Sequence, residues 1–277
     1  MTEKKAILIT GCSSGIGRYS AIELQKDGWN VIATARKDKD LADLEKIGLT
    51  AVYLDYADTA SIHSAFEKTL EFTNGRLDAL FNNGAYGQPG AVEDLKTDVL
   101  RKQFETNFFG WHELTTLCLP VMRKQGHGRI INCSSILGWV HSPWRGAYNA
   151  SKFALEGLTS TMRLELEGTN IHVSLIEPGP IWTKFSENAL QHFLANIDQV
   201  NSPHAERYQL ELQRLENSGG VNRFRLGCDS VHKKLLHALI ADRPKAHYPV
   251  TIPTHFMNAM RRILPTRMVD RILIKSA

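Results

Sequence analysis

The chain has 277 residues, of which 43% are hydrophobic and 22% are charged, and its formal net charge at pH 7 is +4. This composition is ordinary for a globular protein and excludes a disordered chain, a collagen and a coiled coil. The charge excess is too small to indicate nucleic-acid binding. No apolar run has the roughly 20 residues of a spanning helix or the pattern of a secretory signal. The four cysteines have no CxxC spacing, and the histidines show no metal-ligand spacing.

We therefore expect a soluble, cytoplasmic protein without a metal.

Short apolar runs alternate with longer amphipathic segments along the first two thirds of the chain. The runs at 6–10, 31–35, 52–54, 77–82, 129–134 and 172–176 predict strands, and the segments at 15–26, 61–72, 99–123 and 147–167 predict helices. Strands that are apolar on both faces and alternate with helices are typical of a parallel sheet covered by helices. The expected class is α/β, with a Rossmann-type, doubly wound parallel sheet of about seven strands.

The pattern changes beyond residue 184. Residues 187–218 are polar and helix-prone and end at Gly219-Gly220, after which a helix at 230–240 and a short strand at 247–250 are expected. The tail from 252 to 277 is basic and amphipathic and is interrupted by Pro265. We predict a single domain over residues 1–277, made of a core at 5–184, an insert at 185–227 and an amphipathic helical extension at 252–277.

A glycine-rich turn follows the first predicted strand and precedes the first predicted helix. Three glycines let the backbone approach a phosphate, and the helix N-terminus offers free N–H groups and a favourable dipole. The turn also matches the G-x-S-x-G nucleophile elbow of hydrolases, but that elbow normally follows several earlier strands. We favour a dinucleotide site, whose expected contacts are Gly11, Ser13, Ser14, Gly15, Ile16 and Gly17.

The end of the second predicted strand bears on the choice of dinucleotide. Proteins that select NAD usually place an acidic residue there to bond the ribose 2′-hydroxyl. This chain has Ala35 followed by Arg36 and Lys37, and a cation there suits the 2′-phosphate of NADP. Asp38 is a contrary signal beyond the strand, and a solvated charge pair is the plainer alternative. We predict NADP as the cofactor, with Arg36 at its 2′-phosphate.

Tyr148 and Lys152 are four residues apart on a predicted helix and therefore share one face. A tyrosine phenol has a pKa of about 10, which makes it a poor acid–base group at neutral pH. A nearby ammonium lowers that pKa toward the working range. Ser135, on the loop after a predicted strand, is placed to hydrogen-bond the same substrate oxygen as Tyr148. The Tyr-x-x-x-Lys spacing alone is weak, but its conjunction with Ser135 and the glycine-rich turn is rare.

Together these motifs resemble the short-chain dehydrogenase/reductase family, over residues 5 to about 185. The resemblance implies that Tyr148 is the catalytic acid/base, that Lys152 binds the nicotinamide ribose and lowers the tyrosine pKa, and that Ser135 orients the substrate carbonyl. It also implies a water relay through Asn107 and adenine contact by Asp55. Asn83 lies in an Asn-Asn-Gly-Ala stretch that matches the family except that its last two residues are exchanged. Arg36 matches the arginine of NADP-dependent members. The segment that covers the nicotinamide carboxamide in the family is matched by Pro178, Gly179, Ile181 and Thr183.

The stretches at 10–15, 151–157 and 177–181 look like the hydroxysteroid and retinol dehydrogenase branch of the family. They also resemble NADP-dependent aldehyde reductases. Members of that branch act on apolar alcohols and carbonyls. We therefore expect an NADP(H)-dependent oxidoreductase that transfers hydride between the nicotinamide and an aldehyde, ketosteroid or retinoid. The alternatives are a non-catalytic NADP-binding regulatory or scaffold protein and an epimerase or dehydratase. Competent residues at all four catalytic positions argue against the first, and the lack of a separate C-terminal domain argues against the second.

The variable segments leave alternatives open. The insert at 185–227 is interpreted as a substrate lid that excludes water or as a helix that packs on the core. Its apolar residues at helical spacing are Phe185, Leu190, Phe193, Leu194 and Ile197. For the extension at 252–277 we favour packing on the protein over a subunit contact or peripheral contact with an anionic membrane. We also expect a homo-oligomer through the helices at 99–123 and 147–167.

Overall fold

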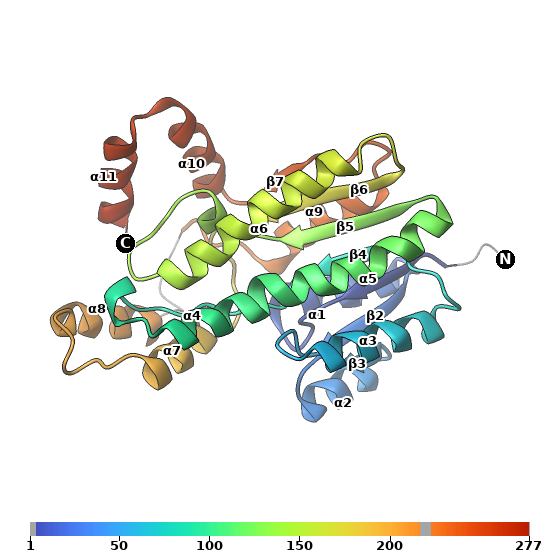
Figure 1. Cartoon of the computed structure of the whole chain (residues 1–277), viewed down its shortest axis with the longest axis horizontal. Coiled ribbons are helices and arrows are strands. Elements are labelled where there is room, and N and C mark those ends of the chain that lie inside the picture. Colours follow the sequence, from blue (N-terminus) through green and yellow to red (C-terminus); the bar gives the residue numbers. More distant parts are fainter. Residues whose placement is uncertain (1–3, 217–222, 277) are drawn as a thin grey trace.

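The inner strands of the sheet are built from apolar runs that are almost entirely buried, whereas the two edge strands are only partly buried. The computed structural model describes residues 4–216 and 223–276 (Figure 1); the expected helix end at Gly219-Gly220 lies outside them. Within this part the sheet has seven parallel strands in the order β3-β2-β1-β4-β5-β6-β7. The strands are β1 (Ala6–Ile9), β2 (Asn30–Ala35), β3 (Thr50–Tyr53), β4 (Ala79–Asn82), β5 (Gly128–Cys133), β6 (Ile171–Glu177) and β7 (His247–Pro249). The predicted doubly wound parallel sheet is confirmed. The strand order reverses between β1 and β4, where such sheets bind ligands at their carboxyl ends.

Helices cover both faces of the sheet. Figure 1 shows α3, α5 and α6 across the near face and α1 and α9 behind it. The helices are α1 (Gly15–Lys26), α2 (Asp38–Lys46), α3 (Thr59–Phe72), α4 (Thr97–Phe104), α5 (Gly110–Gln125), α6 (Gly146–Glu165), α7 (Phe185–Asn196), α8 (Ala205–Glu216), α9 (Cys228–Ile240), α10 (Ile252–Ile263) and α11 (Thr266–Ser276).

Two helical features differ from the expectation. The segment that follows β2 is helix α2, which the sequence did not predict because only Leu44 in it is fully buried and its apolar period is short. The predicted helix at 99–123 is divided into α4 and α5 by a π-helical turn at Glu105–Phe109. Single π turns inside helices are frequent at functional sites, and this one contains Asn107.

A buried hydrogen-bond network joins the carboxyl ends of the central strands. Asn82, at the end of β4, is fully buried and accepts a hydrogen bond from the Tyr56 hydroxyl at 2.6 Å. The same hydroxyl lies 2.9 Å from the Thr10 hydroxyl, beyond the end of β1. The Asn82 amide donates to Asn132 of β5 at 2.9 Å, and Asn132 donates to Thr159 of α6 at 2.9 Å. The network therefore holds β1, β4, β5 and α6 in one arrangement.

The insert forms a small cluster of its own. Buried residues of α7 and α8 pack against Ala91 in the loop after β4. Of the predicted apolar helix face, Phe193 and Ile197 are buried, whereas Leu194 is 49% exposed. Leu194 and Phe185, which is 37% exposed, therefore do not belong to the packed cluster, whereas Leu190, Phe193 and Ile197 do. The insert packs on the β4–α4 loop, which borders the carboxyl ends of the strands (Figure 1).

The C-terminal extension is a pair of amphipathic helices. Pro265 separates α10 from α11, as the sequence predicted. Met257, Val269 and Leu273 pack on Trp139 and Val140 in the loop after β5. Among the residues that the structure describes, no helix is both long enough and apolar enough to cross a membrane.

The network makes a specific prediction for stability. Asn132→Leu is nearly isosteric but leaves the Asn82 amide and the Thr159 hydroxyl short of a buried partner. We expect a loss of about 2 to 4 kcal/mol in the free energy of unfolding, measured by urea denaturation. The control Asn188→Leu, at an exposed position of α7, should change it by less than about 0.5 kcal/mol. Equal losses in the two variants would show that the network contributes little.

Candidate active site

The glycine-rich turn passes close to its own chain. A Cβ atom at Gly17 would lie 2.4 Å from the carbonyl oxygen of Gly11 and 2.7 Å from the Asn83 side-chain nitrogen. Gly11 has φ +69°, and a Cβ there would lie 2.5 Å from the Cα of Gly84. Ser14 precedes α1 and makes no side-chain cap in the described structure. The first amides of α1 therefore remain open toward the turn, as a bound pyrophosphate requires.

Asn83 holds the turn in place. Its side-chain nitrogen donates to the carbonyl oxygens of Thr10 at 3.0 Å and Gly11 at 3.3 Å. Its backbone amide and that of Gly84 both donate to the Thr10 hydroxyl oxygen. The predicted cofactor residue Asn83 thus lies against the turn, where it fixes the backbone conformation.

Arg36 and Asp55 lie together beyond the carboxyl ends of β2 and β3. The Arg36 guanidinium is 3.9 Å from the Asp55 carboxylate, and the Arg36 side chain is 56% exposed. The other carboxylate oxygen of Asp55 accepts from the Ala57 amide at 3.0 Å. The structure therefore brings two residues with predicted adenosine contacts to one place and leaves most of Arg36 open to solvent.

Tyr148 and Ser135 form the buried centre of the site. Tyr148 is in the first turn of α6, Ser135 is the second residue after β5, and each is 8% exposed. Burial raises the pKa of the Tyr148 phenol above its ordinary value, and a side-chain hydrogen bond with Ser135 partly opposes that rise. At neutral pH the phenol is therefore fully protonated and available as a proton donor.

Lys152 lies one turn further along α6 and is almost completely buried. Its ammonium donates to the Cys133 carbonyl oxygen at 2.7 Å and lies 4.2 Å from the centre of the Trp111 ring. It is 5.8 Å from the centre of the Tyr148 ring. Burial lowers the pKa of Lys152 to about 8. In this structure the ammonium points to Cys133, and the lowering of the Tyr148 pKa by Lys152 stays a prediction.

Asn107 lies in the π turn between α4 and α5 and is fully buried. Its side chain makes hydrogen bonds in both directions with the backbone of Tyr86, accepting from the amide at 3.2 Å and donating to the carbonyl at 2.9 Å. It also donates to the Ser151 hydroxyl at 3.4 Å. The structure thus places Asn107 next to the residue that precedes Lys152, and the predicted relay role stays a prediction.

The segment that starts at Pro178 lies between the catalytic loop and the glycine-rich turn. The Pro178 carbonyl accepts from the Ile136 amide at 2.9 Å. The Thr183 methyl would lie 3.1 Å from a Cβ at Gly15. Ile181 forms an isolated parallel bridge with Leu226. A Cβ at Gly179 would lie 2.1 Å from the Thr251 hydroxyl oxygen, so this glycine is required by close packing.

Aromatic side chains outside the predicted site cover the centre. The Phe185 ring, in the first turn of α7, lies 5.3 Å from the Tyr148 ring. The Tyr86 and His192 rings are stacked at 4.1 Å, and burial raises the pKa of Tyr86 to about 12. Tyr86 precedes Gly87, at which a Cβ would lie 2.9 Å from the Phe185 ring and 3.7 Å from the Tyr148 ring. Phe185 belongs to the apolar pattern predicted for the insert. Tyr86 and His192 lie 106 positions apart, and no local pattern connects them.

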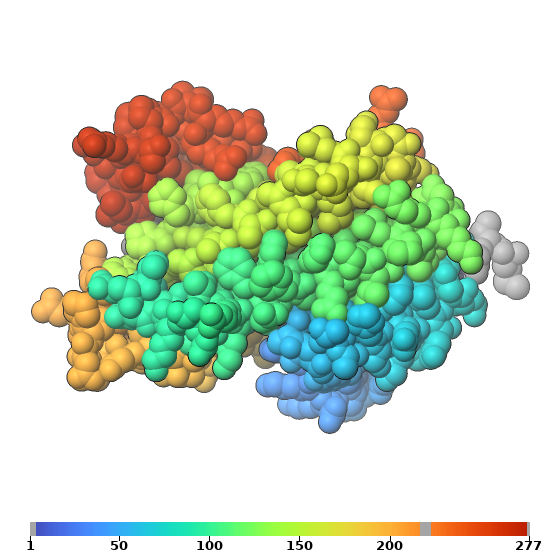
Figure 2. Space-filling view, in the orientation of Figure 1, coloured from blue at the N-terminus to red at the C-terminus, as the bar shows by residue number. Residues whose placement is uncertain are grey.

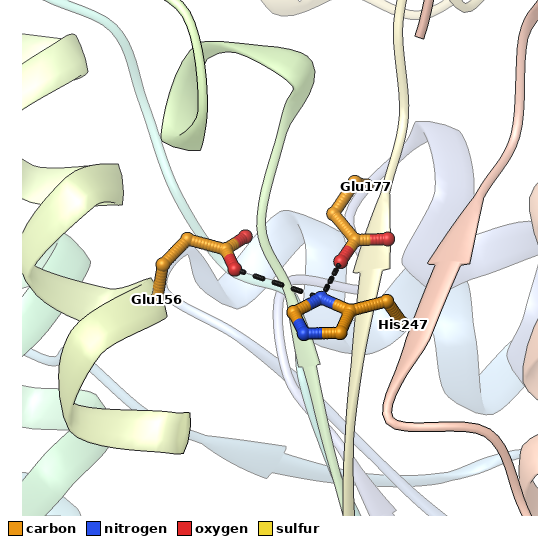
Figure 3. A group of neighbouring side chains, drawn as sticks. All are labelled: Glu156, Glu177 and His247. Atoms are coloured by element: carbon orange, nitrogen blue, oxygen red, sulfur yellow. Dashed lines mark hydrogen bonds and ion pairs between the residues drawn. The ribbon is translucent and has the colours of Figure 1, made fainter. Parts of the chain in front are cut away.

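Glu156, Glu177 and His247 form a second, partly buried cluster that the sequence did not indicate. They come from α6, β6 and β7, and their ligand-type atoms lie within 4.8 Å of one another (Figure 3). His247 Nδ1 is 2.6 Å from Glu177 Oε1 and 3.9 Å from Glu156 Oε2. Burial raises the pKa of Glu177 to about 9 and that of Glu156 to about 7. Protons therefore compensate much of the negative charge, and the cluster joins β7 to the strand that leads to Pro178.

Comparison with known proteins agrees with this geometry. A sequence profile described as short chain dehydrogenase matches residues 5–192. An uncharacterised oxidoreductase of Escherichia coli, YbbO, is 40% identical over 98% of this chain and 94% of its own length. A 3-ketodihydrosphingosine reductase of Bacteroides thetaiotaomicron is 34% identical over 84% of this chain and 85% of its own. A Burkholderia phymatum short chain dehydrogenase/reductase in complex with NAD superposes with a TM-score of 0.78 at 23% identity, covering 95% of this chain and 96% of that one.

The glycine-rich turn makes a prediction with a matched control. In Gly17→Ala the new methyl meets the Gly11 carbonyl, so we expect a loss of about 1 to 3 kcal/mol in unfolding free energy and a loss of nicotinamide-dinucleotide binding. In Gly157→Ala the methyl meets nothing within 4 Å, and a gain of about 0.5 to 1 kcal/mol is expected. Thermal unfolding and fluorescence titration with the dinucleotide measure both effects. Unimpaired binding by Gly17→Ala would contradict the assigned role of the turn.

Proposed function

Because the chain belongs to the short-chain dehydrogenase family and is an oxidoreductase of that family, we propose that it is an NADP(H)-dependent reductase of apolar carbonyl compounds. The proposed substrates are aldehydes, ketosteroids or retinoids, with the corresponding alcohols in the reverse direction. The observation that carries the proposal is the buried Tyr148–Ser135 pair, with Lys152 behind it and the glycine-rich turn beside it. Open amides at the start of α1 and a turn too tight for a Cβ at Gly17 fit a bound dinucleotide.

The chemistry divides between the cofactor and the chain. When bound, NADP(H) supplies or accepts the hydride. Tyr148 protonates the carbonyl oxygen during reduction, and Ser135 donates a hydrogen bond to that oxygen. The burial of Tyr148 and Ser135 and the Phe185 ring packed against Tyr148 limit the access of water to the pair. Since burial keeps the phenol protonated, Tyr148 is in the form that reduction requires.

Lys152 has a supporting role in this proposal. With a pKa of about 8 it stays mainly protonated at pH 7. We propose that it binds the nicotinamide ribose and, in that complex, stabilises the charge that develops on Tyr148 when the proton leaves. Asn107 supports this end of α6 through Ser151.

The choice of NADP and of an apolar substrate rests on separate observations. Arg36 is exposed at the carboxyl end of β2, where a 2′-phosphate would lie, although the Burkholderia neighbour is in complex with NAD. The Phe185 ring gives Tyr148 an aromatic neighbour, which suits an apolar substrate. The name of the Bacteroides relative denotes reduction of a keto group, which is consistent with the proposed reaction.

Self-association and cellular location stay predictions. The surface of α5 and α6 proposed for a homo-oligomer includes Phe153, which is 42% exposed, and Phe109 at the end of the π turn, which is 49% exposed. The cytoplasmic location and the absence of a nucleic-acid partner rest on the sequence alone.

Removal of the phenol tests the mechanism. Tyr148→Phe keeps the ring but removes the proton donor, so we expect NADPH oxidation to fall by about 1,000-fold or more while NADPH binding is kept. The substrates are a panel of aldehydes, ketosteroids and retinal, and the matched control is Tyr53→Phe at an exposed position of β3. Undiminished turnover in Tyr148→Phe would refute the mechanism. NADPH binding by the unaltered protein without turnover of any substrate would favour the scaffold alternative.

Charge reversal tests the cofactor choice. Arg36→Asp should weaken NADPH binding and favour NADH, because a carboxylate repels the 2′-phosphate and accepts from the ribose hydroxyl. We expect the ratio of kcat/KM for NADPH to that for NADH to fall by about 10- to 100-fold. Lys68→Asp, an exposed site on α3, makes the same charge change away from the site and should leave the ratio unaltered. A constant ratio in Arg36→Asp would refute the role of Arg36.

A further inference from the structure

We propose that α10 and α11 form a docking surface for an anionic lipid bilayer. The first observation is an apolar stripe on α10, made of Ile252, Phe256 and Ile263. These side chains are 69%, 50% and 73% exposed. Their spacing of four and then seven residues places them on one face of the helix. The exposed Ala259 lies on the same face between Phe256 and Ile263, so the three side chains share one exposed face of the helix.

This stripe differs from the face by which the helices attach to the protein. Met257 of α10 and Val269 and Leu273 of α11 are buried against Trp139 and Val140. The attachment of the pair therefore already uses one apolar face. The apolar stripe is a second face, and the protein leaves it uncovered in the described structure.

The second observation is the charge of the same segment. Arg267, Arg271 and Lys275 are all exposed and lie four residues apart on α11, which defines a basic stripe. In the part of the chain described, none of the three forms an ion pair. From residue 252 to 275 the sequence has five arginine and lysine residues against one acidic residue, Asp270, which pairs with His141. This local excess equals the net charge of the whole chain.

An anionic bilayer fits both stripes better than a second copy of the chain does. Apolar side chains enter the acyl boundary of a bilayer while arginine and lysine contact its anionic headgroups. Contact between two copies through this face would instead bring the cations of one copy close to those of the other. Helices of 12 and 11 residues are too short to span a bilayer and suited to lie in its surface.

The position of the pair gives docking a consequence for the site. Figure 1 shows α10 and α11 at the end of the sheet toward which the strands point, and Figure 2 shows them as a protruding cap there. The cluster that anchors them includes Ile136 and Leu137, which directly follow Ser135. Docking would place the reaction centre near the lipid in which apolar carbonyl compounds dissolve. This benefit rests on the proposed function, whereas the docking itself does not.

Vesicle sedimentation tests the proposal. The full chain should bind vesicles of phosphatidylglycerol and phosphatidylcholine, bind pure phosphatidylcholine weakly, and be released by high salt. Changing the basic stripe to glutamine should reduce binding about 100-fold, at roughly fivefold per cation. Changing the apolar stripe to serine should reduce it to a similar extent. The control variant carries serine at Val92, Val200 and Leu210, which are 74%, 82% and 55% exposed elsewhere, and should bind like the unaltered protein.

Two further readouts separate the outcomes. Absence of binding to anionic vesicles would overturn the proposal, as would equal binding by the control and both stripe variants. If only the apolar-stripe variant lowers the molecular mass in gel filtration, and vesicles are not bound, the face is instead a contact between copies. NADPH oxidation with a water-soluble aldehyde should be unchanged in all variants. If the unaltered protein binds anionic vesicles but oxidises no NADPH, the result would count against the proposed function and not against the docking surface.

Discussion

The hydrogen bonds of Asn82 are the constraint on which the site depends. A side-chain amide in a fully buried position must find partners for both its oxygen and its nitrogen, and an unmet partner costs about 1 to 3 kcal/mol. Asn82 finds them in Tyr56, Thr115 and Asn132. These residues follow β3, lie within α5 and lie within β5. Satisfying one amide therefore sets the relative positions of the elements that carry the glycine-rich turn, Asn83 and Ser135.

Burial also sets the protonation states at the centre. Burial raises the pKa of Tyr148 and lowers that of Lys152. Both shifts favour the neutral form of the group, because low-dielectric surroundings disfavour either charge. The Cys133 carbonyl and the Trp111 ring nevertheless stabilise the Lys152 ammonium. The result is a protonated phenol on the same helix as an ammonium with which no carboxylate of the described residues forms an ion pair. In the proposed mechanism this phenol is the proton donor, and Lys152 acts on it only in the complex with the cofactor.

Much of the fold could be predicted from the sequence because its signals are local. Both-face apolar strands, glycines at a turn and the four-residue spacing of Tyr148 and Lys152 each lie within a short window. Helix α2 was missed because it buries little, and the π turn at Asn107 has no periodic signal of its own. The cluster of Glu156, Glu177 and His247 was missed for a different reason. Its members lie on three elements, and only the β6–β7 pairing brings them together.

The C-terminal extension is connected to the centre at two points, which makes it more than an appendage. Trp139 and Val140, only a few residues after Ser135, provide the apolar base of α10 and α11. Thr251, just before α10, packs so closely on Gly179 that a single Cβ would not fit between them. Gly179 lies in the segment predicted to cover the nicotinamide. A displacement of the helix pair would therefore also displace the loop after Ser135 and the segment around Gly179, because both are tightly packed against it. The buried face of α10 and α11 thus supports the loop that follows Ser135, independently of what the exposed face binds.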